Sequence, residues 1–244
     1  MKNEVHKWTE KQSQSAKTPN YGKKYVGEPA TLKLMGEVNR KKILELGSGN
    51  GYWLNILAKK KAVCTGVEIS EEQIRLAKNS NQRGIRYVKA DITMSLSRYG
   101  IKQNNYDIIL LEHVLLEIPS KEKIMAVFKN CFKTLKKGGR VIISDLHPFA
   151  PSSNTGNIRR NKNYNYFSSG EIIKIVSKRI DGKETFYSDF HWTLEDLAEC
   201  ITRSGLKIDK IIEPRPSEAL TRRFRQLSYR RKIPMSIMIR AIKV

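Results

Sequence analysis

Residues 43–51 read ILELGSGNG, a short apolar run with one glutamate, followed by glycines at alternate positions. The apolar run has the length and composition of a buried strand. Gly47, Gly49 and Gly51 carry no side chains, so the chain can turn sharply there and a ligand can approach the main chain closely. The stretch therefore predicts the mouth of a nucleotide pocket at the end of a strand.

Apolar runs and amphipathic helical patterns alternate on both sides of this stretch. The expected strands are residues 42–46, 62–68, 85–90, 106–111 and 140–146, and the expected helices are 52–60, 70–79 and 121–137, the last ended by Gly138 and Gly139. Most of these strands stay apolar without alternation, as buried parallel strands do. The pattern predicts an α/β fold with a mostly parallel Rossmann-like sheet, helices on both faces, and ligands beyond the carboxyl ends of the strands.

The chain changes character after the fifth expected strand. Residues 147–192 break the alternation and hold two candidate strands around the turn Asp181-Gly182. Because this insertion leaves the end of a central strand, we expect a lid that binds substrate. A helix and strands at 207–213 and 234–242 then complete a seven-stranded sheet. The expected organisation is an N-terminal lid segment (1–40), a cofactor-binding core (41–146), a substrate-binding lid insertion (147–192) and a C-terminal completion of the core (193–244).

The chain of 244 residues has 46 Lys and Arg against 24 Asp and Glu, a net charge of +22. Such a balance is typical of proteins that bind nucleic acid or a phosphorylated substrate. The alternative is that the protein is generally rich in lysine, so that its exposed surface is basic without a functional role. Basic residues are spread along the whole chain, with one dense cluster at 222–232, and this favours the second interpretation.

Other composition features indicate an intracellular protein. No apolar run is long enough to span a membrane, and the start is too polar for a secretory signal, so we expect a cytoplasmic location. Cys64, Cys131 and Cys200 are odd in number and widely spaced, and we expect reduced core cysteines with no disulfide framework and no metal site.

Polar residues after the second and third expected strands point to the kind of nucleotide. A dinucleotide fingerprint needs a third glycine where this chain has Tyr52. Glu68 ends the second strand, where its carboxylate can accept hydrogen bonds from two ribose hydroxyls and disfavours a ribose phosphate. Asp91 follows the third strand, placed to accept from an adenine amino group, while Ile69 and Ile92 are expected to sandwich the ring.

With these features in place, the sequence resembles the class I S-adenosylmethionine-dependent methyltransferases, particularly the broad type 11-like family that acts on small molecules. The resemblance rests on ELGSGNG (45–51), GVEIS (66–70), KADI (89–92), YDIILLEHVLLEIP (106–119) and LKKGGRVIISDLHP (135–148). It implies S-adenosylmethionine as cofactor, S-adenosylhomocysteine as product, and an antiparallel last strand beside 207–213. The cofactor-binding residues are then Glu45, Gly47, Ser48, Gly49, Gly51, Glu68, Ile69, Asp91, Ile92 and Glu112.

The expected topology brings three of the four histidines to one cleft. His113 follows the fourth strand, His147 follows the fifth, and His191 closes the insertion, so each is a candidate catalytic base. An equally open interpretation is that His147 is a turn residue and that His191 lies at the start of a helix. The candidate substrate-binding residues, which form either an apolar pocket or the insertion's own core, are Tyr166, Phe167, Tyr187 and Trp192.

The function predicted from these patterns is methyl transfer to an oxygen, nitrogen or carbon nucleophile of a small organic molecule in specialised metabolism, by a monomer or homodimer. Methylation of tRNA or rRNA through the basic surface is the alternative, and a non-catalytic cofactor-binding regulator is a third. Known motifs for base-amine and cytosine methylation are missing from the sequence. Asp145-Leu146-His147 is a poor match to the paired Asp and Asn ligands of metal-dependent catechol chemistry. We interpret Asp145 as a solvated strand end, with a substrate contact as the alternative.

Overall fold

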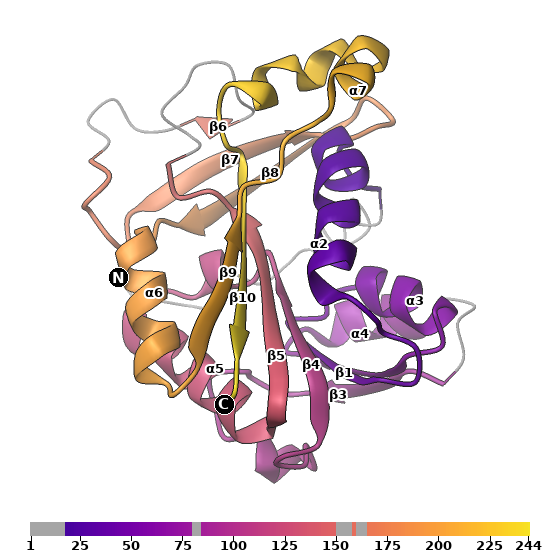
Figure 1. The fold of residues 1–244 in the computed structure, drawn as a ribbon, viewed down its shortest axis with the longest axis vertical. Helices are drawn as coiled ribbons and strands as arrows, with labels where there is room; N and C mark the ends of the chain where they lie inside the picture. Colours follow the sequence, from indigo (N-terminus) through magenta and orange to yellow (C-terminus); the bar gives the residue numbers. More distant parts are fainter. Residues whose placement is uncertain (1–17, 80–83, 150–157, 160–164) are drawn as a thin grey trace.

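The computed structural model describes residues 18–79, 84–149, 158–159 and 165–244 (Figure 1). In this part of the chain the main sheet has the strand order β3-β2-β1-β4-β5-β10-β9. Its strands are β1 (Lys42–Leu46), β2 (Val63–Glu68), β3 (Arg86–Lys89), β4 (Tyr106–Glu112), β5 (Leu135–Leu146), β9 (Lys207–Ile212) and β10 (Ser236–Ile242). β10 runs antiparallel between β5 and β9. The predicted Rossmann-like sheet with its antiparallel last strand is confirmed.

Helices cover both faces of this sheet because alternate residues of each central strand point to opposite sides. Ile108 and Leu110 of β4 pack with Trp53 and Leu57 of a helix on one face, and Ile109 packs with residues of helices on the other. The first face carries α2 (Glu28–Met35), continued from the helical turn η1 (Lys23–Gly27), and α3 (Tyr52–Lys59), whereas α5 (Lys121–Thr134) and α6 (Leu194–Arg203) cover the second.

The remaining helical elements lie in the connections between the strands. They are α4 (Glu71–Lys78), η2 (Leu96–Tyr99), η3 (Leu115–Glu117), α7 (Glu218–Arg223) and η5 (Arg225–Arg231). The three cysteines are buried and free, which confirms the prediction of core cysteines. Within the described residues, no helix is both long enough and apolar enough to cross a membrane.

The helix expected over residues 121–137 ends earlier than the sequence pattern predicts. α5 stops at Thr134, and Leu135 begins β5 with extended backbone, opposite Tyr106 of β4. Leu135 is fully buried, and Gly139 lies so close to the Lys136 and Tyr106 carbonyls that a side chain there would overlap them. Burial of Leu135 and strand pairing therefore outweigh the helical preference of the lysine-rich stretch.

The insertion forms a separate antiparallel sheet of β6 (Ile158–Arg159), β7 (Ile172–Lys178) and β8 (Glu184–Phe190) (Figure 1). The hairpin predicted around Asp181-Gly182 is confirmed as β7 and β8. The hairpin turn also contacts the N-terminal segment, because the Ile180 amide donates to the Pro19 carbonyl at 3.1 Å. Both of the expected lid segments therefore meet on the same side of the molecule.

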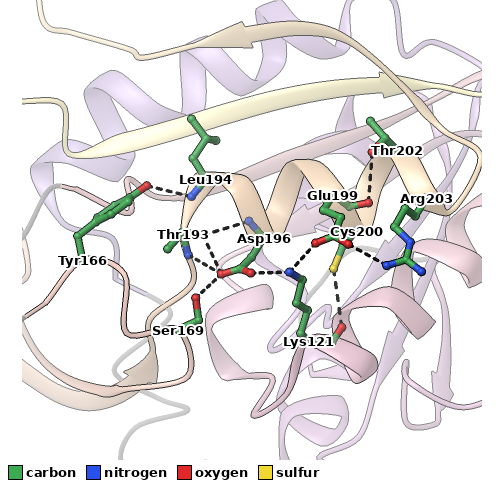
Figure 2. Close-up of polar contacts among 10 residues, drawn as sticks. All are labelled: Lys121, Tyr166, Ser169, Thr193, Leu194, Asp196, Glu199, Cys200, Thr202 and Arg203. Atoms are coloured by element: carbon green, nitrogen blue, oxygen red, sulfur yellow. Dashed lines mark hydrogen bonds and ion pairs between the residues drawn. The ribbon is translucent and has the colours of Figure 1, made fainter.

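The start of α6 anchors the insertion to the core (Figure 2). The Asp196 carboxylate accepts hydrogen bonds from Thr193 and from the Ser169 hydroxyl, and it pairs with Lys121 of α5 at 2.7 Å. Burial raises the pKa of Asp196, but these partners outweigh burial and lower it to about 2. Tyr166 joins the same contact, since its hydroxyl accepts from the Leu194 amide at 3.0 Å. The insertion is thus held at its base by an ionised carboxylate.

Candidate active site

A cavity of about 470 Å³ lies at the carboxyl ends of the parallel strands. All of the predicted cofactor-binding residues line it except Gly51: Glu45, Gly47, Ser48, Gly49, Glu68, Ile69, Asp91, Ile92 and Glu112. These residues come from the ends of β1, β2 and β4 and from the loop after β3. The sequence therefore located the cavity correctly, at the sheet edge where open α/β folds bind ligands.

The three loop glycines have different structural roles although all have positive φ. A Cβ at Gly47 would lie 2.3 Å from Val114, and one at Gly51 would lie 2.3 Å from the Tyr87 hydroxyl. At Gly49 a Cβ would meet nothing within 4 Å. Gly47 and Gly51 are therefore required by packing, whereas Gly49 leaves open space along the cavity wall.

Glu68 is fixed by the loop that it faces. Its two carboxylate oxygens accept hydrogen bonds from the Gly49 amide at 2.8 Å and the Ser70 amide at 2.9 Å. Burial raises the pKa of Glu68, and these backbone bonds partly offset the rise. Each carboxylate oxygen has a second lone pair, so the carboxylate keeps acceptor capacity for two hydroxyl groups while its orientation is fixed.

The residues predicted to bind adenine line the cavity. Asp91 accepts hydrogen bonds through Oδ1 from both the amide and the hydroxyl of Thr93, at 2.8 Å each. Ile92 is buried, and Ile69 is 44% exposed. An exposed isoleucine that lines a cavity offers apolar surface to a flat ring.

Glu45 lies deepest among these carboxylates and has an unsatisfied oxygen. The residue is 3% exposed, and its Oε2 is buried without a hydrogen-bond partner among the described residues. Burial and then the nearby charge of Glu112 raise the pKa of Glu45 well above its ordinary value. An orphaned buried oxygen is costly, so this position favours a ligand that donates a hydrogen bond or carries positive charge.

Glu112 and His113 end β4 beside this carboxylate. His113 has a φ of 51°, a strained region for a residue with a side chain, and its amide donates to the Ser144 carbonyl. Its ring nitrogens lie 3.4 Å from Glu112 Oε1 and 3.4 Å from Asp145 Oδ1. The His113 side chain is 45% exposed. Its partial burial lowers the pKa of His113, but the two carboxylates outweigh this effect and raise the pKa in net.

Asp145 differs from its predicted role as a solvated strand end. It is 1% exposed, because β5 lies between β4 and β10 and His113 contacts its carboxylate. Asp189 of β8 is also buried in this neighbourhood, and burial together with the charge of Asp145 raises its pKa to about 7. The carboxylates near His113 therefore come from three strands, one of them in the insertion.

The other two candidate histidines do not line the cavity. The Nδ1 atom of His147 accepts from the Phe149 amide at 3.0 Å, and its Nε2 lies 2.9 Å from Glu213. His191 is 1% exposed, and its Nε2 lies 2.7 Å from the Tyr166 carbonyl. Since a carbonyl only accepts, this nitrogen carries the proton. The predicted convergence of three imidazoles is not seen, because two of them take part in contacts of the insertion and its neighbours.

Of the candidate substrate-binding aromatics, Tyr166, Phe167 and Trp192 do not line the cavity. Trp192 is 4% exposed and donates to the Ile118 carbonyl, so it belongs to the core. Tyr166 packs on His191 and helps to anchor the insertion, as Figure 2 shows for its contact with Leu194. Phe167 is 79% exposed. The Tyr187 side chain lies outside the described part of the structure.

Several cavity residues were missed by sequence reasoning. Lys23 of η1 lies 2.9 Å from Glu112, and the Tyr52 ring lies below its amine. Tyr52 could have been recognised, since it directly follows the glycine loop. Lys23 had no recognisable signal, because it is far from the cavity motifs in sequence and is one of many lysines in a basic chain.

A family model described as a methyltransferase domain matches residues 37–203. The chain belongs to the class I S-adenosylmethionine-dependent methyltransferases. Solved structures share the fold. A methyltransferase from Mesorhizobium loti is 19% identical, with a TM-score of 0.65, over 88% of this chain and 96% of that one. Geranyl diphosphate C-methyltransferase from Streptomyces coelicolor A3(2), solved with S-adenosylhomocysteine, is 11% identical, with a TM-score of 0.59, over 88% and 78%.

Curated relatives match a shorter part of this methyltransferase. A ubiquinone biosynthesis O-methyltransferase of Coxiella burnetii is 32% identical over 127 residues, which is 51% of this chain and 49% of the relative. An arsenite methyltransferase of Rattus norvegicus is 29% identical over 119 residues, which is 43% of this chain and 31% of the relative. The chain thus spans about half, or less, of the length of these relatives.

The residues of this methyltransferase fit the cofactor of its family. The orphaned Oε2 of Glu45 can accept from an ammonium group, Glu68 from the ribose, and Asp91 from the adenine. Gly49 leaves the wall open beside them. When bound, S-adenosylmethionine supplies an electrophilic methyl group on a sulfonium. The chain's own contribution is to hold that group and exclude water.

The different roles of the loop glycines are testable. In Gly49→Ala the positive φ costs about 1–2 kcal/mol, so the melting temperature should fall by only several degrees. The new methyl group enters the open wall, so we expect S-adenosylhomocysteine affinity to fall about tenfold or more, measured by calorimetry. Gly51→Ala is the matched control: it should lose more stability, because its Cβ overlaps Tyr87. Normal cofactor affinity in a folded Gly49→Ala protein would contradict this assignment.

Proposed function

We propose that this chain transfers a methyl group from S-adenosylmethionine to an oxygen, nitrogen or carbon nucleophile of a small organic molecule. The observation that carries the proposal is the continuous cavity that joins the predicted cofactor residues to His113 and to residues 117–119. Its volume of about 470 Å³ lies within the usual range for small-molecule sites, roughly 300–1,000 Å³. The printed names of the two curated relatives also describe chemistry on small molecules.

The acceptor would enter the part of the cavity at the carboxyl end of β4, which β1 and β2 separate from β3 in the sheet. That end is lined by His113, Val114, Glu117, Ile118 and Pro119. The η3 turn in this stretch lies beside β8 of the insertion. This contact supports the proposed contribution of the insertion to the acceptor site, although no described residue of the insertion lines the cavity itself.

His113 is the histidine that we propose for proton transfer. It lines the cavity, and its strained backbone directs the residue toward Glu112 and Asp145. His147 and His191 have their Nε2 atoms in contact with Glu213 and the Tyr166 carbonyl, and we propose structural roles for both. The carboxylates that raise the pKa of His113 also make its neutral imidazole a stronger base.

The RNA alternative depends on the basic cluster at residues 222–232, which covers α7 and η5. Part of this cluster is engaged inside the chain. Arg231 pairs with Glu218 and donates to the Pro216 carbonyl, while Arg230 lies against Gly22 and over the Tyr229 ring. These contacts give the cluster a structural role, so we favour the small-molecule acceptor. A cytoplasmic location, specialised metabolism and a monomer or homodimer remain predictions.

The acceptor class is tested by incubating the protein with methyl-labelled S-adenosylmethionine and extracts of its host. We expect the label to appear in a small organic product, identified by mass spectrometry. The control is the Glu68→Ala variant, which should lose the labelling because it lacks the carboxylate that binds the ribose hydroxyls. Label recovered in tRNA or rRNA would replace the small-molecule proposal with the alternative.

The pH dependence of turnover tests His113. A base with a raised pKa is protonated at low pH, so turnover should rise with pH through an inflection above the ordinary histidine value of about 6.5. His113→Asn retains a residue type that tolerates positive φ, and we expect it to lower turnover by roughly 10² and remove the inflection. The control His147→Asn should keep the normal turnover and the inflection. A rate that falls as pH rises through this range would show that His113 does not act as the base.

A further inference from the structure

Lys23 brings a positive charge from the N-terminal segment into the cavity. Its Nζ lies 2.9 Å from Glu112 Oε2 and 4.8 Å from the centre of the Tyr52 ring. Its own amide donates to Asn20 Oδ1 at 2.7 Å, which fixes the start of η1. The lysine and its carboxylate partner are mostly buried, at 21% and 7% exposed. A long side chain is thus held in one place between two distant segments.

This lysine lies beside acidic side chains of the cavity. Glu45 and Glu112 are both buried there, and the positive charge of Lys23 acts on both carboxylates. Burial alone would raise the pKa of Glu112, but Lys23 and then His113 outweigh burial and lower it. The ammonium group of Lys23 therefore interacts electrostatically with two carboxyl groups. Glu45 Oε2 still has no hydrogen-bond partner among the described residues.

The amino acid part of S-adenosylmethionine carries one ammonium and one carboxylate group. The ammonium group matches the orphaned oxygen of Glu45. Its carboxylate, in contrast, would be repelled by the ionised Glu112 unless a cation lay between them. Such a cation is required if the cofactor is to bind with its amino acid part at the glycine loop.

Two other lysines that line the cavity are placed elsewhere. Lys89 ends β3, next to the predicted adenine residues, and pairs with Glu71 at 2.6 Å. Lys123 lies in the first turn of α5, beyond Pro119. Lys23, in contrast, lies against Glu112 and close enough to Glu45 to lower its pKa.

We propose that Lys23 binds the carboxylate of the amino acid part of S-adenosylmethionine, so that the N-terminal segment forms one wall of the cofactor site. This inference rests on the proposed function and adds a binding residue to it. Lys23 keeps Glu112 as a partner and places its remaining N–H donors on the ligand. The cofactor carboxylate thereby gains a charge-assisted hydrogen bond in a partly desolvated site.

The placement also links the cofactor to the insertion. The Ile180 amide donates to the Pro19 carbonyl, and Asn20 forms a bridge with Arg179 of the same hairpin turn. Asn20 in turn holds Lys23. A ligand that binds Lys23 therefore stabilises the segment on which the hairpin turn rests.

The test compares two ligands that differ only in the carboxylate: S-adenosylhomocysteine and its decarboxylated analogue, S-adenosyl-3-thiopropylamine. We expect Lys23→Met to lower the affinity for S-adenosylhomocysteine by about tenfold or more in calorimetry, while the affinity for the analogue changes by less than about threefold. Lys23→Arg should restore most of the lost affinity. Lys24→Met is the matched control, since Lys24 pairs with Glu28 outside the cavity, and both ligands should bind it as they bind the unchanged protein.

A second variant separates ligand binding from the loss of a buried ion pair. In Lys23→Met/Glu112→Gln no unpaired Glu112 charge remains, so a purely structural defect should be repaired. We expect this protein still to bind S-adenosylhomocysteine weakly relative to the analogue. Equal weakening of both ligands in Lys23→Met, or equal affinity changes for both ligands in the double variant, would overturn the role of Lys23. Failure of the unchanged protein to bind S-adenosylhomocysteine would instead overturn the proposed function.

Discussion

Buried carboxylates at the carboxyl ends of β1, β2 and β4 are the constraint on which the rest of the site depends. Parallel strands end at one edge, so Glu45, Glu68 and Glu112 gather there by topology alone. Two like charges about 4 Å apart repel by about 4 kcal/mol at an effective dielectric constant of 20. Backbone amides offset the cost at Glu68, and Lys23 offsets it at Glu112. Glu45 keeps an acceptor that no described residue satisfies, which makes the site selective for a cation.

The two segments expected to act as lids are attached in different ways. The insertion is fixed at its base through Asp196, Ser169 and Tyr166, none of which lines the cavity (Figure 2). The N-terminal segment instead contacts the cavity directly through Lys23, at the end of a helix whose other residues pack on the sheet. If Lys23 binds the cofactor carboxylate as proposed, the cofactor contacts the N-terminal segment directly and the insertion only through the hairpin turn that rests on that segment.

Sequence patterns predicted the features that strand order and strand ends determine. Glu68 and Asp91 were found because a residue at the end of a parallel strand has a known place in space. His147 was predicted to reach the cavity from its position after β5, but its side chain turns to Glu213, a contact between segments that spacing does not encode. Lys23 was missed for the same reason. The early end of α5 depends on the burial of Leu135, which only the folded sheet decides.

The net charge of +22 and the acidic cavity are compatible because they act over different distances. At physiological salt, exposed charges are screened beyond about 8 Å, whereas the carboxylates of the cavity are buried and screened much less. The local field at Glu45 and Glu112 therefore favours a positive sulfonium inside a basic protein. In the proposed reaction, methyl transfer removes that positive charge and leaves a neutral thioether. The same carboxylates then stabilise the cofactor more than its product, so the charge that favours binding of the cofactor also favours release of the product.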